Sequence, residues 1–368
     1  MNVHCVDMTS QKLFFAIDFL SLLNQSAFYP EIHVQEDWSN AYGKLFHSFS
    51  SLKITTHPHE HGPEQVQLLF VDLAALKKLQ CSENTLIFPV LRSNELNEYN
   101  KIKARQERPD SFQFIPVDPD SAKRTGIMVP DSSDSMDMLI RMMHPEPMPD
   151  YRVLISAGPT IEDIDPVRFI SNRSTGKMGI ALARAFYRRG ARVKLIAGPV
   201  QVKIPAYLET QRVRSAKEMC AAVLENFNHC DIYIGCAAVA DFTPKHYRQS
   251  KIKKQDGLLK LQLIKTEDIL MQLQALRNQQ MVVGFSVETD TILENSRIKM
   301  KKKKLDLIII NNPLEKGAAF GAETNRVTIL DSDGQIEELP LMSKSDLSEK
   351  IADRIFERIQ KRKNETIA

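Results

Sequence analysis

The chain has 368 residues, which is long for one domain and comfortable for two, and its formal charge of +3 at pH 7 is nearly balanced. That balance argues against a broad nucleic-acid-binding surface, and no apolar run approaches the length of a membrane span. Neither a signal peptide nor paired zinc spacing among the five cysteines is visible, so we expect a cytoplasmic protein with no nucleic-acid or membrane partner.

A proline-alternating segment separates two parts of the chain. The sequence HPEPMPD at residues 144–150 can form neither a regular helix nor a central strand, because proline recurs at every second position. We therefore predict a first domain over residues 1–143, a linker over residues 144–150 and a second domain over residues 151–368.

The second domain opens with a pattern typical of phosphate binding. Val153–Ala157 read as a short buried strand, and apolar residues recur at helical spacing over Gly179–Arg189. The connection between them carries Gly158, Gly176 and several hydroxyl side chains, and such a loop offers backbone N–H groups and a helix N-terminus to a polyanion. The spacing matches neither GxGxxG nor GxxxxGK[ST]. Phosphate binding and an ordinary loop with a capping glycine therefore both stay open on the pattern alone.

Three more short apolar runs follow in the second domain. Residues 232–234 lead into the small-residue stretch GCAAVAD at 235–241, and residues 282–285 and 305–310 are likewise followed by polar residues. Parallel strands present ligand-facing loops in this way in an open α/β sheet. We therefore predict an α/β fold with a Rossmann-like, doubly wound and mostly parallel sheet.

An amphipathic helix closes the chain from about Ser345. Leu347, Ile351, Ile355 and Ile359 recur every four residues and form one apolar stripe. The stripe must be buried, and core packing explains it fully.

The run KMKKKK at residues 299–304 is the most basic stretch of the chain. On a helix, Lys299 and Lys303 lie one turn apart on the same face, whereas the other lysines point elsewhere. Solvated cations, or cations near a helix C-terminus, explain the run as well as anion binding does. Nucleic-acid binding is weakly supported, because no aromatic side chains for base stacking lie nearby.

Taken in order, the motifs of the second domain resemble those of a known family. The segments are AGPTIEDIDPVRFISNRSTGKMG, GCAAVADF, KIKKQ, VVGFSVET, LDLIIINN and FGAETNRVTIL, and they lie between Val153 and Ile359. They are similar to those of phosphopantothenoylcysteine synthetase, which in many bacteria is the carboxyl-terminal half of a bifunctional coenzyme A biosynthetic protein. The resemblance implies CTP-dependent ligation of 4′-phosphopantothenate and L-cysteine through an acyl-cytidylate, with release of CMP and pyrophosphate. It also implies Mg²⁺ and a homodimer formed through this domain.

The resemblance assigns site residues by matching positions. It implies that Asn172 donates to the acyl-nucleotide carbonyl and that Lys251 neutralises nucleotide phosphates. It also implies that Arg168, acting from the neighbouring subunit of a dimer, engages a carboxylate or phosphate of the substrate. The nucleotide-binding residues that it implies are Gly235, Cys236, Ala237, Asp241, Lys251, Glu267, Asp268, Ile269, Leu270, Phe285, Lys299 and Lys303. The family usually has proline where this chain has Glu267. From the residues alone, a turn role for Asn172 and a core role for Phe285 stay open, and metal ligands are not identified.

The first domain resembles a degenerate form of the flavoprotein decarboxylase that occupies this place in the bifunctional family. Arg92 stands where the family has the asparagine of its substrate motif, residues 121–126 lack the family's cysteine acid, and residues 12–19 have no glycine for a flavin phosphate. We therefore expect no FMN and no decarboxylase activity, and a separate decarboxylase is an implied partner. Two other functions stay open. One is a scaffold or binding protein derived from the bifunctional enzyme, and the other is a nucleotide-dependent oxidoreductase, which the absence of GxGxxG disfavours.

Overall fold

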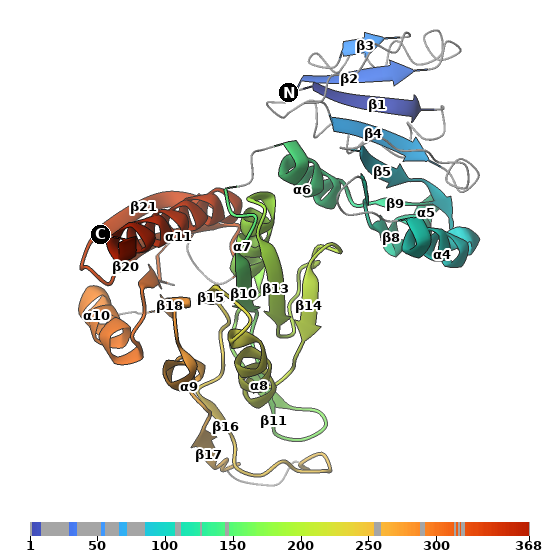
Figure 1. Ribbon diagram of the computed structural model, residues 1–368. Coiled ribbons are helices and arrows are strands. Elements are labelled where there is room, and N and C mark those ends of the chain that lie inside the picture. The colour runs from blue at the N-terminus through green and yellow to red at the C-terminus, as the bar shows by residue number, and fades with distance from the viewer. Residues whose placement is uncertain are drawn as a thin grey trace. The chain divides into compact units, whose positions relative to one another are not determined.

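The computed structural model describes residues 2–8, 29–34, 53–55, 66–71, 85–106, 112–125, 127–143, 147–253, 259–287, 291–312, 314–315, 317 and 321–367. The chain divides into two compact units (Figure 1). Unit 1 comprises Met1–Glu146 and Pro205–Tyr207, and unit 2 comprises Pro147–Ile204 and Leu208–Ala368. Within the described residues, no helix combines the length and the apolar character that a membrane crossing requires.

Unit 1 contains a six-stranded sheet in the order β3-β2-β1-β4-β5-β7, with every pair parallel. Its strands are β1 (Asn2–Met8), β2 (Tyr29–Val34), β3 (Lys53–Thr55), β4 (Val66–Val71), β5 (Thr85–Pro89) and β7 (Phe112–Phe114). A small antiparallel sheet consists of β6 (Leu91–Arg92), β9 (Ile127–Pro130) and β8 (Val117–Asp118). The helical segments are η2 (Ser93–Glu95), α4 (Leu96–Gln106), η3 (Pro119–Ser121), α5 (Ala122–Thr125) and α6 (Ser132–Met143). The strand order is that of a doubly wound α/β domain.

The structure describes only some of the residues on which the predictions for the first domain and the linker rest. Arg92 ends β6, and its N–H donates to Glu95 Oε2 at 2.7 Å. The glycine-free stretch at residues 12–19 lies outside the described residues, as do residues 144–146 of the predicted linker. Pro147–Asp150 belong to unit 2, where Met148 is fully buried.

Unit 2 contains an eight-stranded sheet in the order β14-β13-β10-β15-β18-β19-β20-β21 (Figure 1). Its strands are β10 (Arg152–Ala157), β13 (Arg192–Ala197), β14 (Glu209–Arg212), β15 (Ile232–Gly235), β18 (Met281–Val287), β19 (Leu307–Asn311), β20 (Thr324–Asp331) and β21 (Ile336–Ser343). The strands from β14 to β19 pair in parallel, and β20 and β21 extend the sheet antiparallel. The parallel strands follow the 3-2-1-4-5-6 order of a Rossmann fold, which confirms the predicted α/β class and doubly wound sheet.

The apolar runs of the sequence form the centre of this sheet, as predicted. The run at 305–310 starts its strand two residues later than predicted, at Leu307. The reason is the end of the preceding helix: Lys304 adopts a left-handed conformation with φ 50°, and the Leu305 N–H donates to the Met300 carbonyl at 3.0 Å. This helix-closing hydrogen bond holds Leu305 in the cap rather than in the strand.

Helices cover both faces of the sheet. They are α7 (Lys177–Arg188), α8 (Ala216–Phe227), α9 (Ile269–Leu276), α10 (Ile292–Lys303) and α11 (Lys344–Ile367). Residues of α8, α9 and α10 share one core cluster with Leu154 of β10 and Ile308 of β19. Helices α7 and α11 pack against each other and on strands of the opposite face. The predicted closing helix is α11, and its apolar stripe is buried as expected.

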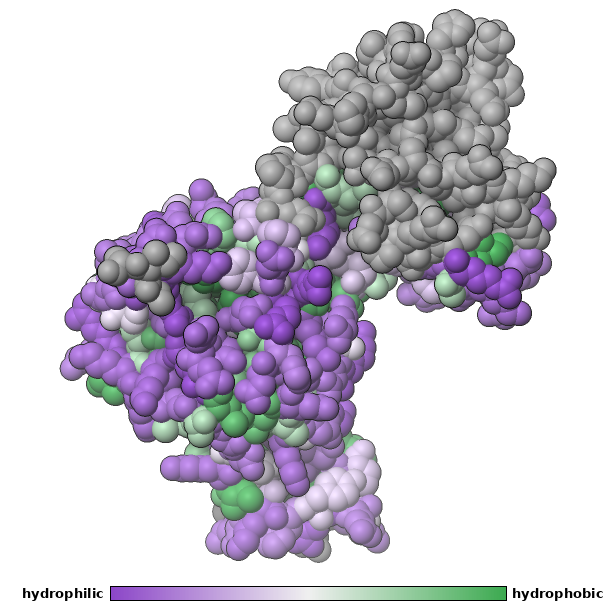
Figure 2. Space-filling view, viewed as in Figure 1, coloured by the Kyte–Doolittle hydropathy of each residue, from purple (hydrophilic) through white to green (hydrophobic). Residues whose placement is uncertain are grey.

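Two short hairpins extend from the sheet and form a structure that we call the arm (Figure 1). It consists of β11 (Ile161–Asp163) with β12 (Phe169–Ser171), β16 (Phe242–Pro244) with β17 (Leu263–Lys265), and the described residues that connect each pair. Its large apolar side chains with exposures of at least 41% are Val167, Phe169, Phe242, Tyr247, Leu259, Leu261, Leu263 and Ile264. Apolar patches interrupt the otherwise hydrophilic surface at this end of unit 2 (Figure 2). The arm therefore exposes apolar side chains that a soluble monomer normally buries.

Candidate active site

The candidate active-site cleft of unit 2 lies between β10 and β15, where the chain stops adding strands on one side of the sheet and starts adding them on the other. Strands β10 and β15 are neighbours, but the chain continues from β10 to β13 on one side and from β15 to β18 on the other. In open α/β sheets the connecting loops diverge at such a point and leave a crevice at the carboxyl ends of the strands. A cleft of about 780 Å³ opens there, with Ser156 of β10, Gly235 of β15 and Phe285 of β18 in its lining.

Most of the predicted site residues line this one cleft. They are Asn172, Gly235, Ala237, Asp241, Glu267, Asp268, Ile269, Leu270, Phe285, Lys299 and Lys303. Cys236, Arg168 and Lys251 are not part of the lining. The Cys236 side chain instead lies against α7, with its Sγ 3.7 Å from the position that a Cβ on Gly179 would take. Burial raises the pKa of this thiol to about 12, so it stays protonated at neutral pH.

The glycine-rich connection from β10 to α7 is tightly packed. Gly176 has a φ of 84°, and a Cβ there would lie 2.3 Å from Cγ1 of Val200. A Cβ on Gly179 would lie 2.5 Å from the Cβ of Ala157, so the first turn of α7 can approach the end of β10 only without a side chain. The glycines thus bring a helix N-terminus close to the carboxyl edge of the sheet, where anions are favoured.

Asn172 ties the β10–α7 connection to the loop that follows β15. Its Nδ2 donates to the carbonyl oxygens of Ala238 and Val239, at 3.1 Å each. Nearby, the buried Thr160 hydroxyl accepts a hydrogen bond from the Ala240 N–H at 3.0 Å. Both hydrogens of the Asn172 amide are therefore engaged by the backbone, and donation to a bound carbonyl requires the exchange of one of these bonds.

Two lysines of α10 reach the opposite side of the cleft. Lys299 Nζ donates to the Phe285 carbonyl at 3.2 Å and to Ser286 Oγ at 3.1 Å. Lys303 Nζ lies 2.8 Å from Asp268 Oδ2, at the residue that caps α9. The two lysines are half-buried one turn apart, whereas Lys301, Lys302 and Lys304 are exposed, as the helical spacing predicts. They place cationic groups beside Phe285 at the end of β18.

Arg168 and the segment after Lys251 meet on the arm rather than in the cleft. The buried Asp165 accepts hydrogen bonds from the Arg168 side chain at 2.7 Å and from the Ile252 N–H at 3.1 Å. Arg168 also donates to the Ile252 carbonyl at 3.2 Å. Burial by itself raises the pKa of Asp165, but the backbone donors Ile252, Val167 and Arg168 and the guanidinium of Arg168 lower it to about 2. Asp165 is thus ionised at neutral pH and holds Arg168 next to the residue that follows Lys251.

Several lining residues were not predicted from the sequence. Arg173 and Lys265 add two cations to the cleft. On its floor, the buried hydroxyls of Ser156 and Tyr233 lie 3.0 Å apart, and burial raises the pKa of the tyrosine. Ser156 is the next-to-last residue of β10 and Tyr233 is the second residue of β15, so only the pairing of these strands brings the two hydroxyls together.

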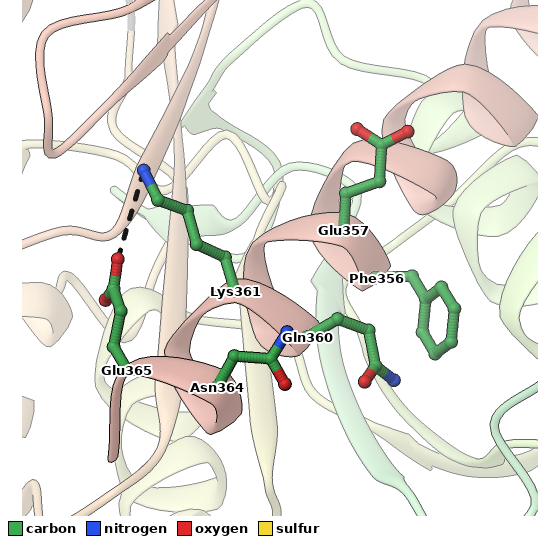
Figure 3. A pocket seen from close by; sticks show the side chains of 6 residues that line it. All are labelled: Phe356, Glu357, Gln360, Lys361, Asn364 and Glu365. Atoms are coloured by element: carbon green, nitrogen blue, oxygen red, sulfur yellow. Dashed lines mark ion pairs between the residues drawn. The ribbon is translucent and has the colours of Figure 1, made fainter. Parts of the chain in front are cut away.

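One other hollow of the described surface is lined by a single helix. The groove in Figure 3 is lined by Phe356, Glu357, Gln360, Lys361, Asn364 and Glu365, which all come from α11. An ion pair at 4.0 Å joins Lys361 and Glu365 there. Among the described residues, no group of three or more His, Cys, Asp or Glu side chains is placed to hold a metal ion.

Comparisons with known proteins find relatives that match more than half of this chain. The coenzyme A biosynthesis bifunctional protein CoaBC of Bacillus subtilis is 50% identical over 210 residues, which are 57% of this chain and 52% of that protein. A cysteine/cysteine sulfinic acid decarboxylase of an unknown prokaryotic organism is 46% identical over 213 residues, 57% of this chain and 59% of that protein. The chain therefore spans about half the length of these curated relatives.

A solved structure and a family model also match this chain. The crystal structure of the C-terminal domain of a CoaBC protein matches 59% of this chain and 100% of its own, with 34% identity and a TM-score of 0.51. The family model described as the DNA/pantothenate metabolism flavoprotein C-terminal domain matches residues 148–359, which is more than half of the 368 residues. The chain therefore belongs to the family of proteins that carry this domain.

Proposed function

We propose that unit 2 is a phosphopantothenate–cysteine ligase of coenzyme A biosynthesis that uses CTP. The observation that carries the proposal is the cleft at the carboxyl ends of β10 and β15. One connected space there is lined by Asn172, the loop after β15, the first turn of α9 and two lysines of α10. The membership in a pantothenate-metabolism family and the name of the Bacillus subtilis relative point to the same pathway.

The chemistry requires activation of a poor electrophile. A carboxylate oxygen of 4′-phosphopantothenate attacks the α-phosphate of CTP, which forms an acyl-cytidylate and releases pyrophosphate. The amine of L-cysteine then attacks the acyl carbonyl, CMP leaves, and the amine loses a proton as the amide forms. Both steps gather negative charge, so fixed cations and hydrogen-bond donors are the groups that lower the barriers.

The cleft residues supply the cations and hydrogen-bond donors that the two steps require. Lys299 and Lys303 are placed to neutralise the triphosphate, and Phe285 offers an apolar face beside them. The backbone of Glu267–Leu270 at the start of α9 is suited to read the base, and Gly235–Ala237 let the nucleotide approach the loop after β15. Asn172 adjoins the same loop and is assigned to the acyl carbonyl.

Magnesium fits this cleft as a companion of the triphosphate. Mg²⁺ is usually held by one or two carboxylates together with substrate phosphates and waters. Asp241 lines the cleft, whereas Asp268 is paired with Lys303. We assign Asp241 as the carboxylate that would contact a metal or the ribose, and the ion would add positive charge at the phosphates.

We also propose that two copies of the chain associate through the arm. Val167, Phe169 and Tyr247 are each more than half exposed there, and a second copy supplies a matching apolar surface. Arg168 and Lys251 lie outside their own cleft, which is consistent with action from the neighbouring subunit. Replacing Phe169 and Tyr247 with serine should convert the dimer into monomers in light scattering, and a wild-type chain that is monomeric at assay concentrations contradicts this assignment.

For unit 1 we keep the prediction that FMN and decarboxylation are absent, so that another protein would supply the decarboxylase. Its motivation is the sequence, where Arg92 replaces the family's asparagine. The purified full chain should show no flavin absorbance near about 450 nm and release no carbon dioxide from phosphopantothenoylcysteine. A yellow protein that releases carbon dioxide would show that the first domain is an active decarboxylase.

The central test is nucleotide-dependent pyrophosphate release. The full chain should release pyrophosphate only when phosphopantothenate is present, and more rapidly with CTP than with ATP. Addition of cysteine should then yield phosphopantothenoylcysteine and CMP in equal amounts. Equal rates with ATP remove the CTP assignment, and no pyrophosphate release with either nucleotide removes the ligase.

A further inference from the structure

A second large cleft lies at the opposite edge of the sheet of unit 2. Parallel strands all begin at the same edge, and the starts of β10 and β18 line this cleft together with the last turns of α11. Its volume is about 1100 Å³, larger than that of the candidate active site. None of the residues in the proposed ligase chemistry takes part in its lining.

Two arginines lie side by side at the amino ends of neighbouring strands. Arg152 of β10 and Arg192 of β13 are Cα partners in the parallel ladder. Like charges at paired positions repel, so this arrangement costs stability unless an anion compensates it. Asp231 compensates Arg152, with Nη2 to Oδ1 at 2.9 Å and Nε to Oδ2 at 3.1 Å. Within the described part of the chain, the structure gives the exposed Arg192 side chain no hydrogen bond or ion pair.

The end of α11 adds further cations to the same space. Lys363 Nζ lies 4.8 Å from the centre of the Tyr151 ring, which holds the ammonium group beside the start of β10. The Tyr151 hydroxyl is buried and has no hydrogen-bond partner among the described residues. The lining cations are Arg152, Arg192, Arg362 and Lys363, and the lining carboxylates are Asp150 and Asp231. Arg362 pairs with Asp306 outside the lining at 3.3 Å, and the lining itself still holds more cations than carboxylates.

We propose that this cleft binds a small phosphorylated anion, at a site separate from the proposed catalysis. The planar, forked donors of arginine match phosphate oxygens, and Arg192 has its donors uncommitted. The lining offers no activated nucleophile, because burial raises the pKa of Cys230 to about 12. The site is therefore a binding site rather than a second catalytic centre, and its occupation compensates Arg192 beside the Arg152–Asp231 ion pair.

The test measures the binding of inorganic pyrophosphate by calorimetry at low ionic strength, because exposed charges are screened by salt. The double variant Arg192→Gln/Lys363→Gln should bind at least about 10-fold more weakly than the wild type, since it loses two charged donors. Arg212→Gln/Lys245→Gln is the matched control. It removes two exposed cations of unit 2 outside this cleft and should bind like the wild type.

A further variant separates this cleft from the candidate active site, to which pyrophosphate could also bind. Lys299→Gln alters only the other cleft, so the binding event that Arg192 and Lys363 control should persist in it with unchanged affinity. Equal affinity in the wild type and the double variant overturns the proposal. So does loss of all binding in Lys299→Gln, because the anion would then occupy the other cleft. None of these measurements requires turnover, so the result is independent of the ligase proposal.

Discussion

Replacing Asn172 with aspartate exchanges an amide that donates two hydrogen bonds for a carboxylate that only accepts. In the wild type, Nδ2 lies 3.1 Å from the carbonyl oxygens of both Ala238 and Val239. The substitution removes both hydrogen bonds and places a negative charge beside two carbonyl dipoles. At about 0.5 to 1.5 kcal/mol for each net hydrogen bond, the tie between the two loops weakens by about 1 to 3 kcal/mol.

We expect Asn172→Asp to form the acyl-cytidylate but to convert it slowly into the amide, because a carboxylate repels the oxyanion that develops on the acyl carbonyl. The assay quantifies pyrophosphate, acyl-nucleotide trapped by acid quench, and amide product in the same samples. Asn226→Asp is the matched control, since Asn226 Nδ2 also donates to a backbone carbonyl, that of Ala222 at 2.8 Å, but lies outside the cleft. The control should lose comparable stability and keep its turnover.

Two results would refute this reasoning. Loss of pyrophosphate release without any trapped acyl-nucleotide would place Asn172 in the activation step. Amide formation by Asn172→Asp at the wild-type rate would mean that Asn172 is a turn residue that only links the two loops.

Three further perturbations probe other parts of unit 2. Lys251→Gln should raise the activation free energy of turnover by about 2 to 4 kcal/mol, the range for losing one preorganised donor. The control Lys253→Gln should leave the turnover rate unchanged. Equal turnover rates for the two variants would make Lys251 a surface residue. Asp165 has a folded pKa of about 2, below the unfolded value of about 3.9, so its stabilisation is present above about pH 4 and is lost as pH falls toward 2. In Asp165→Asn the unfolding free energy should change less over that window, and identical slopes for both proteins would exclude this carboxylate as the cause. Gly179→Ala places a Cβ 2.5 Å from the Cβ of Ala157 and should lower the free energy of unfolding, measured in urea, by about 1 to 3 kcal/mol. An unchanged urea midpoint of unfolding would mean that α7 shifts to accommodate the methyl group without cost.

The sequence predicted the four central strands β10, β15, β18 and β19, because each is a contiguous apolar run bounded by small or polar residues. The edge strand β14, with the sequence ETQR, carries no such signal. The strand patterns also placed the loops after β10 and β15, which line the cleft. Asn172, Lys299 and Lys303 were instead assigned by the family resemblance. The buried Ser156 and Tyr233 pair was missed, because each polar group sits within or at the end of an apolar run and resembles ordinary core there. The pairing of Asp165 with Ile252 joins positions far apart in the chain, and no local pattern reveals it.

The same parallel geometry explains why one edge of the sheet was predictable and the other was not. At the carboxyl edge each strand continues into a loop, so adjacent residues such as Ala237, Ala238 and Val239 line the cleft as part of a recognisable motif. At the amino edge the lining comes from strand starts such as Arg152 and Arg192 and from short polar turns such as residues 278–280, which form no recognisable motif. Arg152 and Arg192 therefore look like ordinary polar flanks, and only the register of β10 and β13 brings them together. Local sequence motifs therefore do not reveal sites at the amino edge of a parallel sheet, because strand pairing in the folded chain brings their charged residues together.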